Sequence, residues 1–245
     1  MQLVAGWHLV LGRHADTLLS DAFDCSAYGL ETSDGLVLFD AGVGRDTATL
    51  PDALARAGLA EGPRHLLITH GHLDHSGGAA AIVARTGARL HTGRQTAVWL
   101  ERGDETAISL GPARDAGLYP ADLRLQPRRV DQQLVDGDTL TIGEAEISVV
   151  ATPGHSADHV SYLVRAHGVT ALVAGDALFS GGEVMLQDTW DSSVAATCAT
   201  IRRLAVLEFD LLLPGHGPPL LTDGRRAADL AMQRVSRFLP PLNLV

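Results

Sequence analysis

The sequence predicts an α/β protein, and two alternating patterns support that prediction. Five short apolar runs have the length and composition of buried strands, over 35–39, 64–68, 146–150, 170–174 and 209–213. Between and after these runs, apolar residues recur at helical spacing, over 53–58, 78–85, 95–102, 192–207 and 224–238. Strands and helices that alternate along a chain are typical of the α/β class.

Each apolar run leads into residues that end a strand. In chain order, the segments that follow the runs are Asp40-Ala41-Gly42, Thr69-His70, Pro153-Gly154-His155, Gly175-Asp176 and Pro214-Gly215-His216. Glycine and proline mark turns, so a polar loop is expected after every one of these strands. The sequence therefore predicts a histidine or an aspartate near five strand ends.

The stretch 103–127 shows neither the apolar run of a buried strand nor the apolar spacing of a helix. It is rich in glycine and proline and contains Tyr119, which is typical of a lid or a variable loop. No linker, internal repeat or low-complexity tract divides the 245 residues. We therefore expect a single domain over 1–245.

Composition excludes several classes of partner. The formal net charge of −10 disfavours nucleic acid, whose phosphates are bound by clustered lysine and arginine. No apolar run is long enough to span a membrane, and no signal peptide is recognisable at the start. Cys25 and Cys198 are too few for a disulfide framework. We expect a cytoplasmic protein that binds a small molecule and neither nucleic acid nor membrane; its oligomeric state is open, with a homodimer possible.

The segment from Thr69 to Gly78 carries the chemistry. It places His70, His72, Asp74 and His75 within six positions, between an apolar strand and a helix start. Imidazole nitrogen and carboxylate oxygen are ligands for zinc, iron or manganese. The alternative is a polar helix cap with incidental histidines. His155, Asp176 and His216 favour the metal site, because ligands at neighbouring strand ends can converge on one edge.

These motifs resemble the five successive motifs of the metallo-β-lactamase superfamily. The matching residues are Asp40, His70 to His75, Thr152-Pro153-Gly154-His155, Gly175-Asp176 and Pro214-Gly215-His216. The resemblance implies an αββα sandwich, in which two mixed sheets carry helices outside. It also implies one metal on His70, His72 and His155, and a second on Asp74, His75 and His216. Asp176 would bridge the two, and Asp40 would orient a ligand histidine unless it is only a turn residue.

The implied mechanism follows from charge. Two divalent metals with the carboxylates of Asp74 and Asp176 and a bridging hydroxide keep a net positive charge, so the centre remains an electrophile. The hydroxide would attack an acyl carbonyl, and Asp74 would carry the proton to the leaving group. Zinc is the expected metal, with iron or manganese as alternatives.

The ligand set is similar to that of glyoxalase II and of related thioesterases and lactonases. True metallo-β-lactamases, as a resemblance, lack the bridging aspartate, which argues against β-lactam cleavage. We expect hydrolysis of an ester, thioester or lactone. One alternative resembles the persulfide dioxygenases, which bind a single iron in this scaffold. Another is a member that binds a small molecule with little turnover.

Several other residues have two interpretations. Tyr119, Phe179, Met185 and Trp190 could wall an acyl pocket or anchor loops into the core. Asp158-His159 could be a proton relay or a substrate contact, but we interpret it as a surface pair before the strand 160–164. We expect Cys25 to be buried as a small apolar group.

Overall fold

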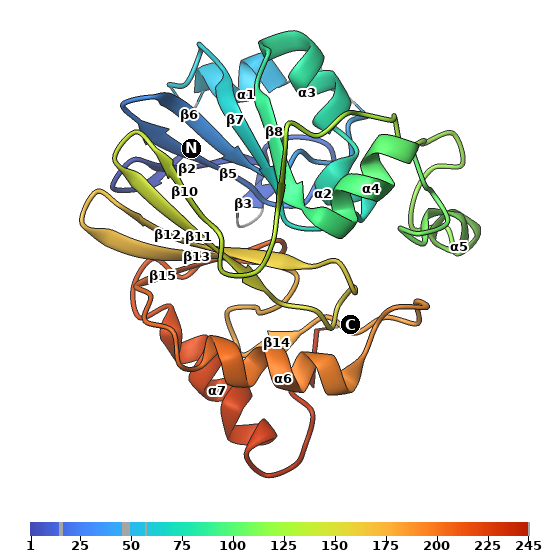
Figure 1. The fold of residues 1–245 in the computed structure, drawn as a ribbon, viewed down its shortest axis with the longest axis vertical. Helices are drawn as coiled ribbons and strands as arrows, with labels where there is room; N and C mark the ends of the chain where they lie inside the picture. The colour runs from blue at the N-terminus through green and yellow to red at the C-terminus, as the bar shows by residue number, and fades with distance from the viewer. Residues whose placement is uncertain (15–16, 46–49, 57, 245) are drawn as a thin grey trace. The chain divides into compact units, whose positions relative to one another are not determined.

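The computed structural model describes residues 1–14, 17–45, 50–56 and 58–244 (Figure 1). The chain divides into two compact units, Met1–Leu134 and Val135–Val245. Each unit contains its own large sheet, so each is described by itself. The expectation of a single domain remains a prediction.

The first unit is built on a mixed sheet with the strand order β1-β2-β5-β6-β7-β8-β9 among its described residues. The pairs from β1 to β6 are antiparallel, and those from β6 to β9 are parallel. The strands are β1 Gln2–Val4, β2 Trp7–Leu11, β5 Ala27–Thr32, β6 Gly35–Phe39, β7 Pro63–Ile68, β8 Arg89–Gly93 and β9 Gln132–Leu134. A small hairpin, β3 Arg13–His14 and β4 Thr17–Leu18, lies outside this sheet. The parallel strands matter for function because β6 and β7 end side by side.

The helices of the first unit are α1 Leu50–Arg56, α2 Leu73–Ser76, α3 Ala79–Thr86, α4 Arg94–Arg102 and α5 Leu110–Asp115. Helix α3 packs against β7 and β8 (Figure 1). Its side chains Ile82 and Val83 are buried. These side chains join a core of aliphatic residues that includes Leu66 and Ile68 from β7. The stretch 103–127 contains only the short α5 as regular structure, which agrees with its lack of period.

The second unit contains the sheet β10-β11-β12-β13-β15, antiparallel except for the last, parallel pair. Its strands are β10 Thr139–Ile142, β11 Ala145–Ala151, β12 Val160–Ala166, β13 Val169–Gly175 and β15 Leu211–Pro214. Helices α6 Val194–Leu204 and α7 Arg225–Val235 pack together and contribute Ile201 and Ala228 to its core. A two-stranded ribbon joins β14 Glu183–Val184 to β16 Leu242–Asn243.

The five strands and five helices expected from the sequence are all present. The strands are β6, β7, β11, β13 and β15, and the helices are α1, α3, α4, α6 and α7. The helix expected over 192–207 begins only at Val194, because the Ser193 hydroxyl accepts the Ala196 N–H and caps it. The helix expected over 53–58 is described from Leu50 to Arg56, and residue 57 lies outside the described residues.

Within the described ranges, the structure has no helix with both the length and the apolar character needed to cross a membrane.

Candidate metal centre

In the first unit, the loop that follows β7 carries four of the expected ligands. The Asp40 N–H donates to Leu67 O at 2.9 Å, so the end of β6 is fixed beside the end of β7. Asp40 has a φ of 64°, a left-handed conformation that aspartate tolerates better than most residues. After His70 and Gly71 the chain forms the single turn α2, in which the Ser76 hydroxyl donates to Gly71 O at 2.8 Å. His70 and His75 are fully buried.

Asp40 accepts hydrogen bonds from several donors of this loop. Its carboxylate accepts the Thr69 N–H at 2.8 Å, the Thr69 hydroxyl at 3.0 Å and Nδ1 of His75 at 2.8 Å. Because the Thr69 hydroxyl donates its proton to Asp40, it accepts a hydrogen bond from Nδ1 of His70, 3.0 Å away. One carboxylate therefore sets the tautomer of two histidines, directly for His75 and through Thr69 for His70.

The remaining ring nitrogens suit a cation. With Nδ1 donating, Nε2 of His70 presents a lone pair and lies 3.2 Å from Nδ1 of His72. In the same way, Nε2 of His75 lies 3.6 Å from Oδ2 of Asp74. Lone pairs that converge with a carboxylate oxygen repel one another unless positive charge lies between them. The donor set and its orientation thus fit a divalent metal.

The ligand loop is attached through backbone groups to the loop that follows β6. The Ala41 N–H donates to His75 O at 2.8 Å, and the Gly78 N–H donates to Gly42 O at 2.9 Å. A Cβ atom added at Gly78 would collide with Ala41 O, and one added at Gly77 would collide with the carbonyl of Val43. Both glycines are required because two backbones meet there without room for a side chain.

Tyr119 contacts Asp74. Its hydroxyl donates to Asp74 Oδ1 at 2.9 Å, and its ring packs on Phe23 with the centroids 6.2 Å apart. The sequence singled out Tyr119 as a substrate contact or a loop anchor; the structure adds a bond to an expected ligand. Because these residues are 45 positions apart, the sequence alone did not indicate that hydrogen bond.

Cys25 is buried beside the same residues. Its sulfur is grouped with Asp40 and His75, with candidate ligand atoms within 4.8 Å of one another. Burial raises the pKa of Cys25 to about 12, so the group is a neutral thiol at physiological pH. Both cysteines are free, as expected from their number. Cys25 therefore packs as a small neutral group.

In the second unit, a parallel strand pair places Asp176 and His216 together. Gly175 on β13 is level with Pro214 on β15, and the Gly215 N–H donates to Gly175 O at 2.8 Å. Asp176 follows Gly175 and His216 follows Gly215, so the two expected ligands leave the same end of this strand pair. Nε2 of His216 lies 3.5 Å from Oδ2 of Asp176, and Nε2 of His155 lies 3.5 Å from the same oxygen. One carboxylate oxygen facing two imidazole nitrogens is an arrangement that suits a bridging ligand.

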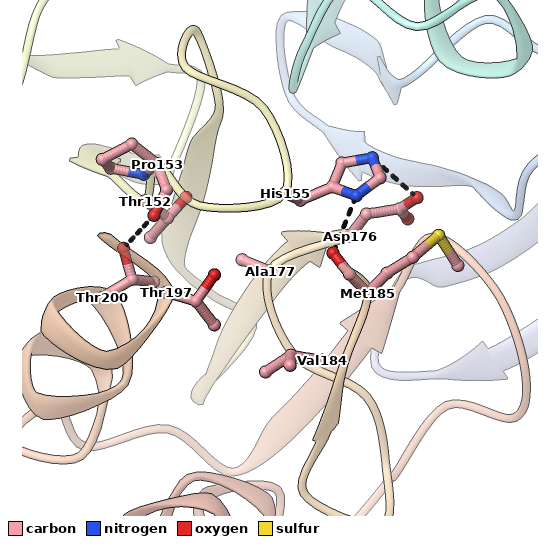
Figure 2. A pocket seen from close by; sticks show the side chains of 9 residues that line it. All are labelled: Thr152, Pro153, His155, Asp176, Ala177, Val184, Met185, Thr197 and Thr200. Atoms are coloured by element: carbon pink, nitrogen blue, oxygen red, sulfur yellow. Dashed lines mark hydrogen bonds and ion pairs between the residues drawn. The ribbon is translucent and has the colours of Figure 1, made fainter. Parts of the chain in front are cut away.

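A backbone carbonyl fixes the orientation of His155. Its Nδ1 lies 3.0 Å from Met185 O, and because a carbonyl only accepts, Nδ1 must carry the proton. Nε2 is then the nitrogen with the lone pair. Figure 2 shows one ring nitrogen of His155 directed at the Met185 carbonyl and the other at the Asp176 carboxylate. The small pocket around them is lined also by Thr152, Pro153, Ala177, Val184, Thr197 and Thr200.

The interpretation of Asp158-His159 as a surface pair is wrong. Both are buried, and His159 is 1% exposed. Nε2 of His159 accepts the Asp176 N–H at 3.0 Å, and Nδ1 donates to the Thr152 hydroxyl at 2.8 Å. His159 thereby fixes the backbone at Asp176. The signal was present in the sequence, because residues 152 and 159 close one loop between antiparallel strands and must face each other.

Three residues after Asp176, expected to wall a pocket or to anchor loops, differ in burial: Phe179, Met185 and Trp190. Phe179 is 2% exposed and belongs to the interior, whereas Trp190 is 65% exposed. Met185 lines the pocket beside His155 (Figure 2). Met185 is brought to His155, where its carbonyl is the acceptor for Nδ1.

Residues 20–216 match the family model of the metallo-β-lactamase superfamily. The chain belongs to this superfamily. Members of the superfamily bind divalent metals, typically zinc, and the histidine and aspartate groups described above could hold such ions.

Curated relatives within the superfamily include thioester hydrolases. The chain is 34% identical over 153 residues to a hydroxyacylglutathione hydrolase of Rhodospirillum rubrum, covering 62% of this chain and 47% of the relative. It is 32% identical over 198 residues to an acyl-coenzyme A thioesterase of Gallus gallus, covering 74% and 68%. The chain spans about half the length of the first of these relatives.

Solved superfamily structures share the fold. A subclass B3 metallo-β-lactamase of Bradyrhizobium japonicum matches with a TM-score of 0.72 and 25% identity, over 97% of this chain and 91% of that one. The metallo-β-lactamase GOB-18 of Elizabethkingia meningoseptica matches with a TM-score of 0.74 at 16% identity, over 97% and 89%. The predicted fold class, the αββα metallo-β-lactamase fold with its mixed sheets and helices, is confirmed.

Proposed function

We propose that this chain is a dinuclear metal-dependent hydrolase that cleaves an acyl thioester, with esters and lactones as related substrates. The observation that carries the proposal is the position of Asp176. Its Oδ2 faces Nε2 of both His155 and His216 at 3.5 Å, as a carboxylate shared between two cations would.

The proposed ligands divide between two ions. His70, His72 and His155 would hold one, Asp74, His75 and His216 the other, and Asp176 both. The tautomers support the role of His70, His75 and His155 as ligands, because each uses Nδ1 as a donor and keeps Nε2 for a metal. Zinc is the proposed metal, since nitrogen and oxygen ligands suit it; iron and manganese accept the same set.

The proposed reaction divides the work between the ions and the protein. Two bound ions would supply a Lewis acid for the acyl carbonyl and would activate a water molecule at neutral pH. Asp74 would take a proton at Oδ1 and pass it to the leaving group. The Tyr119 hydroxyl, 2.9 Å from that oxygen, can donate or accept and so orients the carboxylate.

The thioester class is favoured by two relatives whose names specify it, one acting on acylated glutathione and one on acyl-coenzyme A. Tyr119, Phe179, Met185 and Trp190 remain the proposed substrate contacts. The exposed ring of Trp190 could cover an acyl group. A small acyl compound is the proposed partner, and the proposal includes neither nucleic acid nor a membrane. It leaves the oligomeric state open, with a homodimer as one option.

The test is metal analysis together with a substrate screen. Metal-free protein is titrated with zinc and assayed with acyl-glutathione and acyl-coenzyme A thioesters, p-nitrophenyl esters, lactones, a β-lactam and glutathione persulfide. We expect two ions per chain and the fastest turnover with a thioester. Asp176→Ala should lower both the metal content and the rate, whereas Asp229→Ala, an exposed aspartate on α7, should change neither.

Other outcomes would replace the proposal. A single tightly bound iron with oxygen consumption on the persulfide would identify a dioxygenase. Two bound ions without turnover of any compound would identify a binding protein.

A further inference from the structure

The C-terminal strand β16 is bonded to the segment that supports His155. Leu242 is level with Glu183 and Asn243 with Val184 in the parallel β14-β16 ribbon. The Leu244 N–H continues this ribbon by donating to Val184 O at 2.9 Å. The last described residues of the chain therefore hold the backbone immediately before Met185.

The side chain of Asn243 holds the backbone immediately after Met185. Its Oδ1 accepts the Leu186 N–H at 2.8 Å, and its Nδ2 donates to Leu186 O at 3.0 Å. An asparagine amide has an NH2 donor group and a carbonyl acceptor in one plane, so it can satisfy both backbone groups of one residue as a neighbouring strand would. Val184 and Leu186 are thus both bonded to the C-terminal strand.

Met185 lies between these two bonded residues, and its carbonyl is the acceptor for Nδ1 of His155 at 3.0 Å (Figure 2). Peptide groups are planar, so fixing the residues on either side limits how the Met185 carbonyl can rotate. The direction of that carbonyl decides which nitrogen of His155 carries the proton. The C-terminal strand therefore acts on His155 through two hydrogen-bonded steps.

We propose that Asn243 is a positioning residue for His155. It keeps the Met185 carbonyl directed at Nδ1, so that Nε2 retains its lone pair toward Oδ2 of Asp176. The inference rests on the proposed function in taking His155 as a metal ligand. The apolar side chains of the strand do not carry this role, because Leu242 is 50% exposed and Leu244 is 43% exposed.

Three variants distinguish the role of the Asn243 side-chain amide from that of the rest of the strand. Asn243→Ala removes both bonds to Leu186. Asn243→Asp keeps the acceptor for the Leu186 N–H and loses the donor for Leu186 O. Leu242→Ala is the matched control, since it changes an exposed side chain of the same strand. Thermal unfolding of each variant establishes that it folds before the other measurements are made.

The first readout is the hydrogen bond from Nδ1 of His155 to Met185 O in the metal-free protein, measured by NMR as the chemical shift and the water-exchange rate of the Nδ1 proton. We expect the wild type and Leu242→Ala to keep this hydrogen bond. Asn243→Ala should show a weakened bond and faster exchange, with Asn243→Asp between them. An Asn243→Ala protein that folds and keeps the bond as in the wild type would overturn the inference.

The second readout is zinc affinity, measured by competition with a chromophoric chelator. Loss of a group that orients a ligand typically weakens metal binding by about 10- to 100-fold. Because Asn243 is exposed, we expect about tenfold for Asn243→Ala. If His155→Ala weakens binding and a folded Asn243→Ala does not, the inference fails and the proposed ligand set stands. If the hydrogen bond from Nδ1 weakens in Asn243→Ala while the wild type binds no zinc, the proposed function fails and the positioning role stands.

Discussion

The two groups of candidate ligands are supported in different ways. In the first unit, His70, His72, Asp74 and His75 occupy one loop, and the buried carboxylate of Asp40 holds it. In the second unit, His155, Asp176 and His216 come from three separate strand ends. Neutral groups support them, namely a carbonyl at His155 and an imidazole at the Asp176 backbone.

The two groups differ in how strongly their supporting contacts act on the ligands and in how many residues supply those contacts. A carboxylate that accepts from Nδ1 makes the imidazole a more basic ligand, whereas a carbonyl mainly orients it. The first group relies on a single charged residue, so it should be the more fragile to one substitution. The second relies on several weaker contacts, so each substitution there should cost less.

Replacement of Asp40 should have the largest effect. Asp40→Ala leaves three buried donors without their acceptor, namely the Thr69 N–H, the Thr69 hydroxyl and Nδ1 of His75. At about 1–3 kcal/mol for each unsatisfied group, the free energy of unfolding should fall by several kcal/mol. Urea unfolding measures the loss, with Asp34→Ala as control, because Asp34 is an exposed carboxylate in the turn between β5 and β6. Equal stability of the two variants would remove the contrast between the units.

Acid should destabilise the first unit more than the second. His65 and His91 are buried on β7 and β8, with their ring nitrogens 3.1 Å apart. Burial, together with the neighbouring His65 and Arg89, lowers the pKa of His91 to about 4. Burial also lowers the pKa of His65, and the carboxylate of Asp34 partly opposes this shift. In the unfolded chain both titrate near 6.5, so below that pH the unfolded state binds more protons and stability falls.

The loss in the free energy of unfolding that is due to His91 should begin near pH 6.5 as the pH falls. It should level off near pH 4, at about 3 kcal/mol. Hydrogen exchange at pH 7 and pH 4.5 should show the amides of β7 and β8 losing protection before those of β12 and β13. His91→Gln should reduce this difference, while His167→Ala, an exposed histidine of the second unit, should leave it unchanged. Equal loss of protection in both sheets would contradict the prediction.

Replacement of His159 should cost less than replacement of Asp40. His159→Ala leaves the buried Asp176 N–H without its acceptor, which predicts a loss of about 1–3 kcal/mol in the free energy of unfolding. Zinc affinity should fall less than in Asp176→Ala, because the carboxylate remains. A loss of zinc as large as that of Asp176→Ala would mean that His159 is itself a ligand.

Removal of the Tyr119 hydroxyl should have the smallest effect on stability. Tyr119→Phe removes one partly exposed hydrogen bond, at about 0.5–1.5 kcal/mol. Since it orients Asp74, we expect a several-fold lower kcat with KM and zinc affinity nearly unchanged, and no effect of Leu118→Ala next to it. A raised KM with unchanged kcat would instead indicate a direct substrate contact.

Local features of the site could be predicted from the sequence. The strand at 35–39 and the ligand loop at 70–75 depend on neighbouring residues, so apolar runs and motif spacing were sufficient to find them. Strand β8 was missed because its five residues, Arg-Leu-His-Thr-Gly, form no apolar run. Its two parallel neighbours, β7 and β9, and not its own composition, keep it in the sheet.

The supporting contacts could not be predicted, because they join distant parts of the chain. His155 finds its acceptor 30 positions away at Met185, and Asn243 finds Leu186 57 positions away. A backbone carbonyl has no signature in a sequence, since every residue possesses one. His159 is the exception, because strand pairing alone would have placed it opposite Thr152.

The backbone bonds between the loop after β6 and the ligand loop determine which substitutions the protein can accept. Ala41 and Gly78 are joined to His75 and Gly42 through peptide groups, so these bonds do not depend on any side-chain donor or acceptor. Gly77 and Gly78 cannot vary, since any Cβ would meet a carbonyl oxygen. In a laboratory evolution experiment, substrate preference could therefore change through 103–127 or the loop around Trp190, while this glycine pair stays the same in every active descendant.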